Sequence, residues 1–104
     1  MAIKYATDEN YKELVSEGVV LVDFYGKTCV PCKMLARVLE EIDDEFPFVD
    51  IVKVDTDECP KTSKEFNING IPDLYYYKDG KVINHETGFG SKDMVLSSLA
   101  KLLY

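Results

Sequence analysis

One continuous apolar run limits the folds open to this chain more than any other feature of the sequence. Residues 19–25 read Val-Val-Leu-Val-Asp-Phe-Tyr, with β-branched and aromatic side chains at nearly every position. A strand of this composition is typically buried on both faces, as in sheets that helices cover on both sides. Residues 30–46 change to a helical period, with apolar side chains on one face at Leu35, Val38, Leu39, Ile42 and Phe46. A buried strand followed by an amphipathic helix predicts an α/β fold.

The remaining segments continue this alternation of strands and helices. We expect strands at residues 3–5, 48–54, 73–78 and 81–87, the last two joined by a tight turn at Asp79-Gly80. We expect further helices at residues 8–17 with Thr7 as N-cap, at residues 60–66, and from Ser91 onward. The element order βαβαβαββα predicts a three-layer α/β fold, with a mixed, mostly parallel central sheet flanked by helices. A length of 104 residues predicts a single domain over residues 1–104.

The charge balance excludes two classes of partner. Lys and Arg number 12 against 19 Asp and Glu, which gives a formal net charge of −7. Nucleic-acid binding needs clustered positive charge, and an anionic membrane repels an acidic chain, so we expect neither partner. No apolar run approaches the roughly 20 residues that span a bilayer, and the N-terminus lacks the apolar stretch of a secretion signal. We therefore expect a cytoplasmic protein in a reducing compartment.

The cysteines indicate chemistry rather than a scaffold. There are three of them, Cys29, Cys32 and Cys59, which is too few for the disulfide framework of a small secreted domain. Cys59 precedes Pro60 at a possible helix N-cap, but Asp57 and Glu58 beside it oppose a thiolate, so we expect no redox function for it.

The motif Cys29-Val30-Pro31-Cys32 lies in the short turn between the predicted strand and helix. A lone C-x-x-C motif occurs in zinc sites, in redox sites and by chance, but α/β folds place ligands at this end of a strand. Cys29 would occupy the helix N-cap, where free N–H groups and the helix dipole stabilise a thiolate. Pro31 suits the first turn and holds the cysteines one turn apart, so that Cys32 can resolve a mixed disulfide formed at Cys29.

Four motifs, in this order and spacing, resemble the thioredoxin family over nearly the whole chain. They are Val22-Asp23-Phe24-Tyr25, Cys29-Val30-Pro31-Cys32-Lys33-Met34, Gly70-Ile71-Pro72 and Lys78-Asp79-Gly80. The resemblance implies a thiol–disulfide oxidoreductase that reduces protein disulfides, with Cys29 as nucleophile and Cys32 as resolving cysteine in a redox-active disulfide. It also implies a monomer without a cofactor, recharged by a separate flavin- or ferredoxin-dependent thioredoxin reductase, because the chain has no nucleotide-binding glycine fingerprint.

The same resemblance implies roles for residues outside the cysteine motif. Asp23 matches the family's buried acid beneath the cysteines, where burial raises its pKa and makes it a proton acceptor for Cys32. Lys53 matches a lysine near that acid. Pro72 matches a cis-proline facing the cysteines, and Ile71 before it offers main-chain groups to an extended substrate.

We expect the substrate to be bound around these groups by the side chains or backbone of Thr28, Val30, Ile71, Asp73, Gly88 and Phe89. Three of these positions depart from the usual family sequence. Thr28 stands where thioredoxins place Trp, Val30 replaces Gly between the cysteines, and Asp73 replaces the Thr that commonly follows the cis-proline. A carboxylate of Asp73 that faced Cys29 would raise the pKa of that thiol. The departures leave the reduction potential and the reductase open.

Other functions are compatible with the same residues. One alternative is thiol exchange of a glutaredoxin-like, oxidising or isomerising kind. Another is a non-catalytic thioredoxin-fold module that binds a partner or a metal. Cys29, Cys32, Cys59 and His85 could formally provide four zinc ligands, but only one pair has local spacing, so we expect no metal. We expect His85 to be a surface residue of the hairpin.

Overall fold

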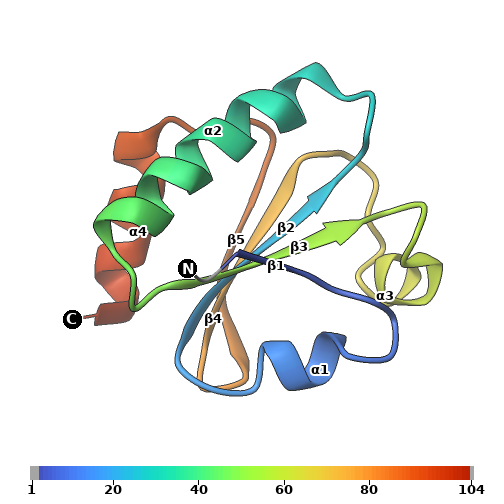
Figure 1. Cartoon of the computed structure of the whole chain (residues 1–104), viewed down its shortest axis with the longest axis horizontal. Coiled ribbons are helices and arrows are strands. Elements are labelled where there is room, and N and C mark those ends of the chain that lie inside the picture. The colour runs from blue at the N-terminus through green and yellow to red at the C-terminus, as the bar shows by residue number, and fades with distance from the viewer. Residues whose placement is uncertain (1–2, 104) are drawn as a thin grey trace.

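The computed structural model describes residues 3–103 and has the element order that the sequence predicts (Figure 1). Its strands are β1 (Ile3–Tyr5), β2 (Val19–Tyr25), β3 (Asp50–Asp55), β4 (Asp73–Lys78) and β5 (Lys81–Thr87). Its helices are α1 (Tyr11–Leu14), α2 (Val30–Glu45), α3 (Pro60–Glu65) and α4 (Lys92–Leu103). No helix in this part of the chain is both long and apolar enough to cross a membrane.

The strands form one mixed sheet in the order β1-β3-β2-β4-β5. β1, β3 and β2 pair in parallel, whereas β4 pairs antiparallel with both β2 and β5, so β4 alone runs against the other strands. The mixed, mostly parallel sheet is therefore confirmed. The antiparallel register also has a functional consequence. It places Asp73 opposite Phe24, so the segment that leads into β4 lies beside the end of β2.

Helices cover both faces of the sheet and divide the core in two. Figure 1 shows α2 and α4 on one side of the strands and α1 and α3 on the other. Leu21, Ile51 and Leu74 pack with the buried residues of α2 and α4. Val22 and Phe24 pack toward Tyr11 and Cys59 on the opposite side. Because successive residues of a strand face opposite sides, Asp23 points toward α2.

The first helix differs from the expectation of a helix at residues 8–17. Only the single turn Tyr11–Leu14 is helical, because Thr7 and Asn10 form a closed turn before it. The Thr7 N–H donates to Asn10 Oδ1 at 2.7 Å, and the Asn10 N–H donates to Thr7 Oγ1 at 3.1 Å. Asp8 accepts hydrogen bonds from the backbone and hydroxyl of Thr62, at 2.8 and 2.7 Å. It therefore satisfies free N–H groups at the start of α3 rather than at its own helix.

Candidate active site

The two cysteines lie at the start of α2, after the short loop that follows β2. Cys29 is the N-cap of α2, and its Sγ accepts a hydrogen bond from the Cys32 N–H at 3.2 Å. The two residues form a disulfide, with their Cα atoms 5.2 Å apart. Cys29 is partly exposed, whereas Cys32 is 2% exposed. An incoming group can therefore reach the sulfur of Cys29 more easily than that of Cys32.

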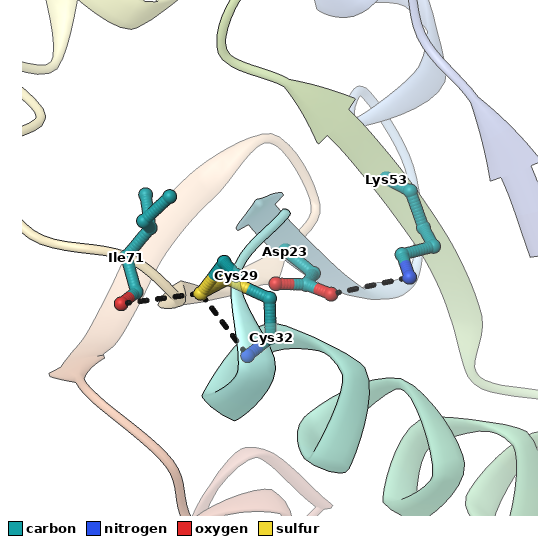
Figure 2. Close-up of a disulfide and its surroundings, with 5 residues drawn as sticks. All are labelled: Asp23, Cys29, Cys32, Lys53 and Ile71. Carbon is teal, nitrogen blue, oxygen red and sulfur yellow. Dashed lines mark hydrogen bonds and ion pairs between the residues drawn. A yellow bond between two sulfur atoms is a disulfide. The ribbon is translucent and has the colours of Figure 1, made fainter. Parts of the chain in front are cut away.

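The segment before β4 approaches the cysteines from the other side. The peptide bond between Ile71 and Pro72 is cis, and the Ile71 carbonyl oxygen lies 3.9 Å from Cys29 Sγ (Figure 2). The Gly88 N–H donates to the Pro72 carbonyl at 2.8 Å, which joins the end of β5 to the same segment. These contacts place Ile71, Pro72 and Gly88 together beside the disulfide.

Gly26 leaves room for the Ile71 side chain beside the cysteine loop. A Cβ atom at residue 26 would lie 2.8 Å from Ile71 Cδ1, which is closer than real Cβ contacts. Sequence reasoning did not single out this glycine, because its role depends on a contact with a residue far away in the chain. Its place in the turn between the predicted strand and the predicted helix was the one local feature that could have pointed to it.

Asp23 is fully buried behind the cysteine pair. In the view of Figure 2 its carboxylate lies between the cysteines and Lys53, whose Nζ is 3.6 Å from Asp23 Oδ2. Neither carboxylate oxygen has a hydrogen-bond partner within residues 3–103. Burial raises the pKa of Asp23 from 3.8 to about 6, and the positive charge of Lys53 opposes that rise. An acid of this pKa can exchange a proton near neutral pH.

Two further contacts fix the charges at this end of the sheet. Lys53 Nζ lies 4.6 Å from the centre of the Tyr25 ring, a cation–π contact that helps hold a largely buried ammonium. Lys27, in the loop before Cys29, lies 3.6 Å from Asp55 Oδ2 and 3.1 Å from Glu58 Oε2. Its charge is therefore directed at the β3–α3 loop, and the pairing ties that loop to the cysteine loop.

Comparison with known proteins agrees with this geometry. The family model described as thioredoxin matches residues 2–101. The chain belongs to the thioredoxin family. It is 43% identical over 104 residues to a thioredoxin of Bacillus subtilis, an alignment that covers 99% of this chain and 100% of that one. It is 36% identical over 99 residues to a thioredoxin of Chlamydia trachomatis, with 95% and 97% of the two chains covered.

Family membership and the disulfide together establish the chemistry. The protein is a thiol–disulfide oxidoreductase, and its redox pair is Cys29 and Cys32. Thioredoxins act through their own cysteines without a cofactor, and they exchange electrons with a reductase and with disulfide-containing substrates. Within residues 3–103 no group of three or more His, Cys, Asp and Glu side chains could hold a metal ion.

A raised pKa of the Cys29 thiol would require the Asp73 carboxylate to face Cys29, and the structure shows which groups this carboxylate meets. Asp73 shares its face of the sheet with Phe24 and Tyr75, opposite the face of Asp23. Its carboxylate accepts hydrogen bonds from His85 Nε2 at 2.5 Å and from Thr87 Oγ1 at 2.9 Å. The carboxylate is therefore engaged by β5 rather than by Cys29, because a strand's neighbours, and not its sequence, decide which groups a side chain meets.

Cys59 and His85 lie apart from the redox pair. Cys59 is fully buried, and its thiol donates to the Ala6 carbonyl at 3.3 Å. Burial and nearby carboxylates raise the pKa of Cys59, which keeps it as a thiol. His85 is exposed on β5, as expected of a surface residue of the hairpin, and its Nε2 lies 2.5 Å from Asp73 Oδ1.

The rim of the site is apolar on one side. Val30 is 66% exposed and Phe89 is 42% exposed. Thr28 is exposed as well, and Ile71 is half-buried. Met34, which sequence reasoning did not include, is also exposed one turn after Val30. Its position in the first turns of α2 was the signal that could have identified it.

Proposed function

We propose that Cys29 is the attacking cysteine and Cys32 the resolving one in the reduction of protein disulfides. The observation that carries this assignment is the greater exposure of Cys29 at the N-cap of α2, beside Ile71. Free N–H groups at a helix start stabilise a thiolate, which is the form that attacks a disulfide.

The exchange proceeds in two substitutions at sulfur. The Cys29 thiolate attacks one sulfur of the substrate disulfide, forms a mixed disulfide and displaces the other substrate sulfur as a thiolate. The Cys32 thiolate then attacks Cys29 Sγ, which releases the second substrate thiolate. The substrate gains two electrons and the protein is left with the Cys29–Cys32 disulfide.

Asp23 is the proposed proton acceptor for Cys32. A pKa of about 6 leaves Asp23 mostly ionised at neutral pH and able to take up a proton. A cleft of about 240 Å³ is lined in part by Cys32, Lys33 and Lys53, whereas Asp23 is fully buried and does not line it. Water in this cleft would reach Cys32 and Lys53, which supports a proton route on this side of the disulfide.

The proposed substrate groove runs between the cysteines and the cis-proline segment. An extended protein segment would pair with the main chain of Ile71 beside Pro72 and contact Gly88. The exposed side chains at the rim that would meet the rest of the substrate are Thr28, Val30 and Phe89. Exposed apolar side chains around a reactive centre are typical of surfaces that receive protein partners.

Trapping the mixed disulfide tests the roles of the two cysteines. Cys32→Ser should accumulate a covalent complex with disulfide-bonded insulin, because nothing resolves the bond formed at Cys29. Cys29→Ser should form no complex and lose insulin-reducing activity. Cys59→Ala is the matched control and should behave as the native chain does. A covalent complex in Cys29→Ser, or full activity of that variant, would show that the assignment is wrong.

We also propose a cytoplasmic monomer whose residues 1–104 act as one domain. A single sheet with both faces covered supports the one-domain assignment. The electron donor would be a separate flavin- or ferredoxin-dependent reductase. Supplying each reductase, and glutathione, to the oxidised protein and counting the thiols formed would separate these donors.

A further inference from the structure

A polar cluster occupies the edge of the sheet on the face opposite Asp23. It consists of Asp73, His85 and Thr87. The Asp73 carboxylate is 4% exposed, and its Oδ1 accepts both the His85 ring N–H and the Thr87 hydroxyl. His85 and Thr87 belong to β5, the outermost strand, whereas Asp73 begins β4. The cluster therefore joins the two strands at one end of their ladder.

The imidazole in this cluster is held from a second direction. The His85 ring stacks on Tyr75, with centroids 4.1 Å apart and planes inclined by 12°. Tyr75 in turn packs edge-to-face on Phe66, at 4.9 Å. An edge-strand side chain would otherwise move freely in solvent, so this packing gives the donor to Asp73 a fixed place.

The cluster adjoins the backbone on the cis-proline side of the proposed substrate groove. Asp73 directly follows Pro72, and Thr87 directly precedes Gly88. The Gly88 N–H donates to the Pro72 carbonyl at 2.8 Å, and Asp73 pairs with Thr87 in the next position of the ladder. Asp73 and Thr87 are therefore each one residue away from the two residues, Pro72 and Gly88, that are joined on this side of the groove.

A buried carboxylate places strong demands on its donors. Leaving such a charge without hydrogen bonds costs several kcal/mol, so the chain near Asp73 must adopt the arrangement that brings both donors to it. Without the His85 donor, Thr87 alone would remain, and Asp73 would turn toward water. This movement of the Asp73 side chain would shift the backbone that directly follows Pro72.

We propose that His85 is a positioning residue for substrate binding, which acts through Asp73 to fix Pro72 relative to Gly88. This inference rests on the proposed groove between the cysteines and the cis-proline segment. His85 is not assigned a contact with the substrate or a part in the exchange at sulfur. Its effect is on how well an extended protein segment fits the groove. It therefore changes the reduction of protein disulfides and not that of small-molecule disulfides.

The choice of two substrates separates positioning from general stability. A disulfide-bonded protein such as insulin must lie in the groove, whereas 2-hydroxyethyl disulfide can reach Cys29 without it. With dithiothreitol as electron donor, His85→Leu should raise the KM for insulin by about fivefold, the size expected from losing part of one charged hydrogen bond. The kcat for insulin and the rate with 2-hydroxyethyl disulfide should stay within about twofold of the native values.

Three further variants test the path through Asp73. His85→Gln retains an N–H donor and should restore most of the native KM. Thr87→Val removes the second donor and should raise the KM for insulin as His85→Leu does. In an Asp73→Thr background, His85→Leu should have no further effect. Asn84→Leu, a neighbouring substitution on β5 away from Asp73, is the matched control.

The possible outcomes are distinct. Equal losses on both substrates, an unchanged insulin KM in His85→Leu, or an undiminished effect of His85→Leu in the Asp73→Thr background would each overturn the proposal. Failure of the groove itself would appear differently, as a native protein whose insulin reduction does not saturate with insulin concentration.

Discussion

Asp23 and Lys53 face each other across β2 and β3, with 3.6 Å between Oδ2 and Nζ. They do not form a fully paired, hydrogen-bonded ion pair, because the carboxylate oxygens have no hydrogen-bond partner within residues 3–103. Burial therefore dominates the ionisation of Asp23, and its pKa rises to about 6 despite the nearby cation. The site keeps an acid that is costly to ionise, which is a common feature of catalytic proton acceptors.

Replacing this acid should stabilise the protein at neutral pH. The pKa of Asp23 is higher in the folded protein, about 6, than the 3.8 of an unperturbed carboxyl. Protonation therefore favours the folded state, and this contribution is complete below about pH 4 and lost as the pH rises through about 6. Asp23→Asn should raise the free energy of unfolding at pH 8 by roughly 3 kcal/mol, with little change at pH 4.

Urea unfolding of the oxidised protein from pH 4 to pH 8 measures this difference between variant and native chain. Asp44→Asn, which removes an exposed carboxylate from α2, is the control and should show no such pH dependence. A stability difference that stays the same at pH 4 and pH 8 would contradict a raised pKa at Asp23.

Removing Lys53 should move the ionisation of Asp23 further from its ordinary range. The positive charge of Lys53 lowers the pKa of Asp23, so Lys53→Met should raise that pKa above 6. The pH at which insulin reduction reaches half its maximum should shift in the same alkaline direction. A carbon-13 NMR titration of the Asp23 carboxyl measures the pKa directly, with Lys81→Met on β5 as an exposed control. An unchanged titration would mean that Lys53 does not act on Asp23.

The main features of the fold could be predicted because they depend on local patterns. The apolar run at residues 19–25 required a covered strand, and that strand is fully buried from Val20 to Phe24. The place of Cys29 at the start of α2 followed from the order of strand, turn and helix. In each of these cases a residue's surroundings are set by its own element and the next.

The remaining features depend on contacts between distant segments. The helix expected at residues 8–17 was too long, because Asp8 is bonded to Thr62 on α3. The partners of Asp73 depend on β4 lying antiparallel between β2 and β5. A carboxylate, an imidazole and a hydroxyl separated by 12 and 14 positions give no local sign that they will meet.

Cys59 should be inert in the native protein despite its place at the start of α3. Its thiol is fully buried and its pKa is raised, so it lacks both access and thiolate character. After reduction of the disulfide, iodoacetamide should label Cys59 about a hundredfold more slowly than Cys29. Mass spectrometry of timed samples measures the labelling, and samples in urea should show all three cysteines modified. Native labelling of Cys59 at the rate of Cys29 would contradict its burial.

Gly26 should leave room for the Ile71 side chain between the cysteine loop and the cis-proline segment. In Gly26→Ala the new Cβ would meet Ile71 Cδ1 at 2.8 Å, so that terminal methyl group must turn away. Leaving a preferred rotamer costs about 0.5–1.5 kcal/mol, whereas the Ile71 carbonyl can stay beside Cys29. We therefore expect a lower melting temperature and a nearly unchanged rate of insulin reduction. Adding Ile71→Val removes the δ-carbon that causes the clash, so the double variant should recover the native melting temperature. Calorimetry measures the melting temperature, and a double variant as unstable as Gly26→Ala would show that the Gly26–Ile71 contact is not the cause.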